Sequence, residues 1–171
     1  GGWGYAARDG NSDTSVTGWQ VMGLELARAK GLVTATSSLR HAMNWIDSVT
    51  TPDGRVGYRE PGAHPNGAAA LTAVGMLAHL LTEPVRDAAR LERQAALIAA
   101  EAPGEILRPG AEGVNDFYRW YFTSLALFQH GGPAWDRWNA ALKPALLAAQ
   151  DREGDHAGSW GPLDRWSGYG G

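Results

Sequence analysis

The stretch of sequence that decides the fold lies at residues 66–81 and reads NGAAALTAVGMLAHLL. It contains no Asp, Glu, Lys or Arg, and it is rich in Ala and Leu, which are strong helix formers. A helix that is apolar on every side is buried, because none of its sides gains from contact with water. We therefore predict a fully buried helix here, near the middle of the chain.

Two further segments have the same character. Residues 14–30 carry no charge before Glu25, and residues 116–130 carry only Arg119 after the opening Asp116. Each charge-poor segment is followed by one in which apolar and polar residues alternate at helical spacing. These amphipathic segments lie at 38–50, 87–102 and 135–149. The sequence thus predicts a buried inner helix followed by a half-exposed outer helix, three times over.

Candidate capping residues set the length of the repeating unit. Asp13, Asn66 and Asn115 stand at or just before the three charge-poor segments, where their side chains suit the free N–H groups of a helix start. Their separations of 53 and 49 residues indicate a helical repeat whose units bury their faces against their neighbours. We predict one all-α domain over residues 1–171, with repeats at 1–53, 54–103 and 104–157 and a fourth beginning at 158–171.

Two local features qualify this prediction. Pro144 falls inside the sixth helix and is expected to kink or split it, because proline removes a backbone donor and clashes with the preceding turn. The chain opens on Gly1-Gly2-Trp3, with no leader and no initiator methionine. We therefore expect it to be a segment of a longer protein, and its localisation stays open.

The composition excludes several classes of function. Lys and Arg number 15 against 18 Asp and Glu, and a net charge of −3 does not attract a nucleic-acid backbone. No run approaches the roughly 20 apolar residues of a membrane-spanning helix. The absence of Cys excludes disulfides and thiolate metal sites. We expect no nucleic-acid partner, no transmembrane segment and no cofactor.

The five histidines do not show the spacing of metal ligands, so no metal site is expected. His79 and His130 fall near the ends of predicted helices. We expect these two to bind the terminal backbone carbonyls of their helices.

A dense aromatic cluster gives the clearest signal of a pocket. Its rings cover more than one side of the helix at 116–130, so some of them face an inner lumen or an interface. They are Phe117, Tyr118, Trp120, Tyr121 and Phe122. Candidate ligand-binding residues are Tyr118, Arg119, Trp120 and Tyr121, together with Trp19 on the first helix. Core packing is the alternative role for the rings, and pairing with Asp116 is the alternative for Arg119.

Asp13 and Asp116 are the candidate catalytic acids. Each has a simpler alternative role at a helix start: Asp13 as an N-cap, and Asp116 as a first-turn acid that complements the helix dipole.

The loops carry a resemblance to a known family. Gly1-Gly2-Trp3 resembles the end of a motif that runs Gln, three residues, Gly, one residue, Trp, and Gln150, Gly154, Gly158 and Trp160 resemble a widened copy. This motif marks the prenyltransferase and squalene-oxidase repeat proteins, relatives of squalene-hopene cyclases. Residues 13–20 and 135–139 are similar to segments of uncharacterised bacterial members. The resemblance covers the whole chain and implies an α/α toroid, of which three helical hairpins make about half.

The resemblance also bears on catalysis. Cyclases of this family place Asp, any residue, Asp, Asp before an inner helix, and the matching stretch here is Gly10-Asn11-Ser12-Asp13. Only Asp13 matches, and Ser12 occupies the place of the proton donor. The zinc of the related protein prenyltransferases is held by Asp, Cys and His, and this chain has no Cys.

These observations favour a repeat domain without catalytic activity that acts as a scaffold or as a binding module for a protein or an apolar small molecule. A second copy or additional repeats would complete the toroid. One alternative is an isoprenoid (terpene) cyclase or lipid binder that uses an aromatic lumen. Another is a carbohydrate-active α/α barrel, with aromatic rings as sugar platforms and a pair of carboxylates.

Overall fold

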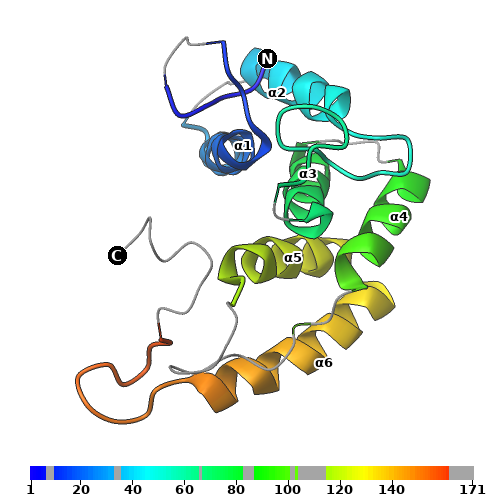
Figure 1. The fold of residues 1–171 in the computed structure, drawn as a ribbon. Coiled ribbons are helices and arrows are strands. Elements are labelled where there is room, and N and C mark those ends of the chain that lie inside the picture. The colour runs from blue at the N-terminus through cyan, green and yellow to red at the C-terminus, as the bar shows by residue number, and fades with distance from the viewer. Residues whose placement is uncertain are drawn as a thin grey trace.

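The computed structural model of the chain describes residues 1–6, 10–32, 36–65, 67–82, 87–100, 103 and 115–161. Over these residues the fold is all-α, as predicted, with six helices and no strand (Figure 1). The helices are α1 (Thr14–Ala29), α2 (Thr36–Ser48), α3 (Ala68–Thr82), α4 (Ala88–Ala99), α5 (Phe117–His130) and α6 (Gly132–Ala149). The predicted cap Asn66, residues 104–114 and residues 162–171 lie outside the described part.

The helices form two layers. In the inner layer, α3 packs against α1 on one side and α5 on the other, and each inner helix contacts the outer helix that follows it. Figure 1 shows the outer helices α2, α4 and α6 along the outside of an arc, with α1, α3 and α5 inside it. The charge-poor segments are therefore the inner helices and the amphipathic segments the outer ones.

Helix α3 is the centre of the core, and every residue from Ala70 to Leu80 is buried. The predicted complete burial of this helix is confirmed. The same prediction is wrong for the other two inner helices. Trp19 and Leu26 of α1 are 46% and 66% exposed, and Tyr121 and Phe128 of α5 are 45% and 62% exposed. Within the described residues α1 has an inner-layer neighbour, α3, on one side only. Its opposite side therefore keeps its apolar residues in contact with solvent.

Helix α6 continues through Pro144 without interruption, so the expected split does not occur. The proline leaves the carbonyl of Ala140 without its usual partner. Both residues are exposed, and water can bind that carbonyl in place of the missing N–H.

Close contacts with glycine fix the spacing of the inner layer. A methyl group on Gly18 of α1 would overlap Cγ1 of Val74 in the buried α3. A methyl group on Gly75 would lie 2.7 Å from Cγ2 of Val56, in the loop that follows α2. Glycine lets these backbones approach α3 and its neighbours more closely than any other residue allows.

Replacing Gly18 by Ala is expected to lower the free energy of unfolding by about 1–3 kcal/mol, because the added methyl overpacks the contact with Val74. Gly23→Ala on the same helix is the matched control. Gly23 has open space around it, so that variant is expected to be more stable by up to about 1 kcal/mol, through helix propensity alone. Urea unfolding measures both, and equal effects of the two substitutions would contradict the close-packing argument.

Candidate functional site

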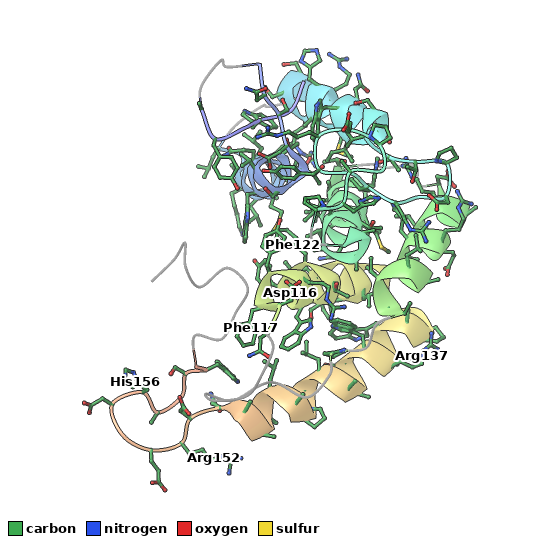
Figure 2. The ribbon with its side chains drawn as sticks, in the orientation of Figure 1. Asp116, Phe117, Phe122, Arg137, Arg152 and His156 are labelled. Carbon is green, nitrogen blue, oxygen red and sulfur yellow. The ribbon has the colours of Figure 1, made fainter. Side chains whose placement is uncertain are left out.

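Aromatic rings from α1 and α5 meet on the inner layer. Trp19 stacks on Tyr121 with 5.5 Å between ring centroids and 26° between planes, and it meets Phe122 edge-on at 5.0 Å. Trp19 and Tyr121 are 46% and 45% exposed, whereas Phe122 is fully buried. Figure 2 shows Phe122 on the side of α5 that faces α1 and α3. A buried ring thus supports two half-exposed rings that come from different helices.

The exposed apolar residues form two stripes. Leu26 follows Trp19 by seven residues on α1, and Phe128 follows Tyr121 by seven residues on α5. Seven residues are close to two helical turns, so each pair lies on one side of its helix. All four side chains are well exposed, and Phe128 also meets Trp135 of α6 edge-on at 5.3 Å. We refer to Trp19, Leu26, Tyr121 and Phe128 as the inner aromatic surface.

The structure separates the residues predicted to bind a ligand. Trp19, Tyr118 and Tyr121 lie together, and Tyr118 contacts Phe122 at 4.9 Å. Trp120 instead lies in the core, where it packs edge-on against Phe117 at 5.3 Å. Its neighbour Arg119 places its guanidinium 5.9 Å from the ring centroid of Trp138 on α6. Sequence spacing could not divide this cluster, because adjacent large aromatic residues cover every side of the helix.

Asp116 is the N-cap of α5, and its Oδ1 accepts the backbone N–H of Arg119 at 2.9 Å. Figure 2 marks its position on the inner layer. Asp13 plays the corresponding role for α1, where its Oδ1 accepts the Val16 N–H at 2.9 Å and the Ser15 hydroxyl at 2.6 Å. The simpler alternative, a cap, therefore describes Asp13 as the structure places it. Asp116 was expected in the first turn and is instead the cap, whereas the expected cap Asn115 is a buried residue just before it.

Asp13 nevertheless has a feature that a cap does not require. Its side chain is completely buried, and its second oxygen, Oδ2, has no hydrogen-bond partner. An unsatisfied buried oxygen typically costs about 1–3 kcal/mol. Asp13 therefore presents an acceptor that nothing among the described residues uses.

Two tyrosines lie around this carboxylate. Burial, followed by the charge of Asp13, raises the pKa of Tyr58 above its ordinary value. Burial raises the pKa of Tyr118 much further, with contributions from Tyr5, Asp13 and Asp116 among others. Both phenols thus stay protonated over the usual pH range and remain able to donate.

Sequence reasoning missed Tyr58, although a signal was present. Gly54-Arg55-Val56-Gly57-Tyr58 repeats the pattern of Gly1-Gly2-Trp3-Gly4-Tyr5, so the two tyrosines occupy matching positions. The loop that carries Tyr58 is held to the start of α1, because the Thr14 hydroxyl donates to the Gly57 carbonyl at 2.6 Å. This contact brings Tyr58 to Asp13.

A second polar cluster joins three helices. His79 of α3 is completely buried, with Nδ1 3.1 Å from Arg90 of α4 and Nε2 3.3 Å from Asp47 of α2. A guanidinium only donates, so His79 Nδ1 is the acceptor and the proton of the neutral ring lies on Nε2. Arg90 also binds Asp47 directly at 2.8 Å. Both ring nitrogens thus contact side chains of other helices, which fits a structural role better than that of a catalytic base. We refer to His79, Arg90 and Asp47, which link α2, α3 and α4, as the brace.

The expected role of the two helix-end histidines is therefore wrong. His79 contacts Asp47 and Arg90, and His130 Nε2 lies 3.2 Å from Glu92 of α4. In both cases the partner belongs to an outer helix. The carbonyls at a helix end point along its axis, whereas these side chains leave the helix sideways, toward the other layer.

The brace is testable through Asp47. The hydrogen bond with His79, aided by the charges of His79 and Arg90, holds the pKa of Asp47 below its ordinary value of 3.8. A lowered pKa stabilises the fold above the unfolded-state value, and the stability is lost as pH falls through the folded-state value. Asp47→Asn is expected to cost at most about 1 kcal/mol near neutral pH, because the pair is half exposed.

Urea unfolding of wild type and Asp47→Asn from pH 7 to pH 2.5 checks this prediction. The difference between the two proteins should vanish at the acid end. Asp136→Asn, at an exposed position on α6, is the control and should show no such trend. A difference that stays constant with pH would contradict the brace.

The described residues show neither a metal site nor a membrane-spanning helix. Among the described residues, no three His, Cys, Asp or Glu side chains gather as metal ligands would. None of the described helices is both long and apolar enough to cross a membrane. Comparison with family models, curated proteins and solved structures finds no match to this chain.

Proposed function

We propose that this domain is a binding module of the helical-repeat type, and that its inner aromatic surface binds an apolar small molecule. One observation carries the proposal: Trp19 and Tyr121 stack on each other from different helices while nearly half of each side chain is exposed. Large aromatic side chains are usually buried, and a contiguous apolar surface marks an interaction site.

The dimensions of the surface suggest the class of ligand. Each stripe spans seven residues, which corresponds to roughly 10 Å along a helix. An elongated hydrocarbon such as an isoprenoid chain covers that length and needs no hydrogen-bonding partner along it. The resemblance of the loops to prenyltransferase and squalene-oxidase repeats supports the same class of ligand.

Binding of farnesol, a linear isoprenoid alcohol, tests the proposal. Titration followed by NMR is expected to shift the indole N–H signal of Trp19. Trp19→Ala should weaken binding about tenfold, because loss of one well-placed aromatic contact costs about 1.4 kcal/mol. Trp160→Ala is the matched control, since Trp160 is 38% exposed in the loop that follows α6.

The outcomes separate the alternatives. Farnesol binding that Trp19→Ala weakens and Trp160→Ala leaves unchanged supports the proposal. A cello-oligosaccharide titration is run in parallel, because aromatic rings also serve as sugar platforms. Binding of the sugar in preference to farnesol would favour the carbohydrate-active alternative, and no binding of either probe would leave a protein-binding scaffold.

A second candidate function rests on the buried carboxylate. The free Oδ2 of Asp13, close to Tyr58 and Tyr118, supports acid chemistry of the isoprenoid-cyclase kind. In that reaction a carboxylic acid transfers its proton to an alkene carbon, and aromatic faces stabilise the resulting carbocation. The inner aromatic surface, on the same two helices, would supply those faces.

Incubation with squalene and with geranylgeraniol, followed by gas chromatography and mass spectrometry, tests this function. Cyclic products that disappear in Asp13→Asn are the expected result. Asparagine caps a helix as well as aspartate does, so the fold is retained. Asp116→Asn is the matched control, because it changes the equivalent cap of α5. Products that persist in Asp13→Asn, or no products at all, would reject the acid role.

A further inference from the structure

Two segments with the same sequence pattern make the same contact. Gly1-Gly2-Trp3-Gly4 precedes α1, and Gly54-Arg55-Val56-Gly57 precedes α3. The Trp3 backbone N–H donates to Oγ1 of Thr17 at 2.9 Å. The Val56 backbone N–H donates to Oγ1 of Thr72 at 3.2 Å. In each case the third residue of the segment is held by a fully buried threonine of the next inner helix.

Each segment also contacts the outer helix of the same hairpin. Gly1 packs so closely on α2 that an added Cβ would lie 2.6 Å from the His41 carbonyl oxygen. Gln94 of α4 donates its side-chain N–H to the Gly54 carbonyl at 3.0 Å. The segments therefore bridge the two helices of the hairpin that follows them, and this contact defines what a third segment of the same kind would bind.

The third such segment is Gly158-Ser159-Trp160-Gly161, which follows α6. Its shape is already fixed by its own loop. Gln150 donates its side-chain N–H to the Gly158 carbonyl at 2.8 Å, and the Asp151 N–H donates to the Ser159 carbonyl at 2.9 Å. The Trp160 indole N–H donates to the Leu146 carbonyl at 2.9 Å, which anchors the segment to the end of α6.

This third segment is more exposed than the other two. Every residue from 151 to 160 is exposed, whereas Val56 is completely buried at the matching position. Figure 2 shows the loop, marked by Arg152 and His156, projecting from the end of α6. Among the described residues, the Trp160 backbone N–H has no acceptor.

The buried threonines at the matching positions of α1, α3 and α5 do not serve as that acceptor. Thr17 and Thr72 already hold Trp3 and Val56. Thr123 matches them in sequence, because Phe122-Thr123-Ser124 follows the pattern of Leu71-Thr72-Ala73. Its hydroxyl is completely buried, however, and the exposed Trp160 does not reach it.

We infer that Gly158–Gly161 is a docking segment for a further helical hairpin of the same type. That hairpin is not among the residues that the structure describes. The inner helix of that hairpin presents a threonine or serine hydroxyl, preceded by an apolar residue and followed by a small one, to the Trp160 N–H. Its outer helix contacts the Gly158 backbone. This inference is independent of the proposed ligand and of any acid chemistry, because it uses neither the inner aromatic surface nor the Asp13 carboxylate.

Addition of a hairpin to the full chain tests the inference. Ala68 lies 14 positions after Gly54, so a copy of residues 68–100 placed directly after Gly171 begins at the same distance from Gly158. The added copy supplies its own equivalent of Thr72. Helical signal by circular dichroism should rise, and exchange of the Trp160 backbone N–H measured by NMR should slow at least tenfold.

A variant with Thr72→Val in the added copy alone is the matched control. It keeps the shape of the hairpin but removes the acceptor, so the slowed exchange at Trp160 should be lost while the added helices persist. Fast exchange of the Trp160 N–H in the protein with the unaltered added hairpin overturns the inference, whether or not the added segment becomes helical. A concentration-dependent dimer of the original chain that protects Trp160 would overturn it in favour of a second copy as the occupant.

Discussion

The fold depends on the close packing of α3 against all of its neighbours. Its residues from Ala70 to Leu80 are buried without exception, so the helix has no side that is stable in water. Gly18 and Gly75 allow α1 and the loop after α2 to approach closely, and α4 and α5 enclose the rest. A single helical hairpin cannot bury α3 on all sides. The three hairpins are therefore expected to fold together and not one by one, as in repeat proteins whose units stack.

The inner aromatic surface follows from the same constraint. Helices α1 and α5 both cover α3, and each turns its opposite side away from the described core. Trp120 and Tyr121 are adjacent in sequence, yet the first lies in the core and the second is half exposed. Position relative to α3, and not residue type, decides which rings pack and which are available to a ligand. A substitution that loosens α3 should therefore also disturb this surface.

The sequence predicted what depends on local pattern. Hydrophobic periodicity located six helices and the burial of α3, and cap chemistry located Asp13, because each is set within a few residues. At α5 the same reasoning chose Asn115, one residue before the actual cap Asp116. Exposure of Trp19 was not predictable, since it depends on which helices lie beside α1. The contact of His79 with Asp47 and Arg90 was missed for the same reason: it requires the relative positions of three helices. Tyr58 reaches Asp13 only through the fold.

Asp13 is the point at which the structure departs most from what stability requires. A cap needs one oxygen, and a serine at this position would supply it without burying a second. Asp116 provides a comparison, because it caps the equivalent helix but is only partly buried. The extra cost at Asp13 is a buried oxygen that is left without a partner, next to two phenols that remain protonated. Native structures satisfy most buried polar atoms, and exceptions concentrate at functional sites. Asp13 therefore combines the cap that α1 needs with a second buried oxygen that the cap does not need.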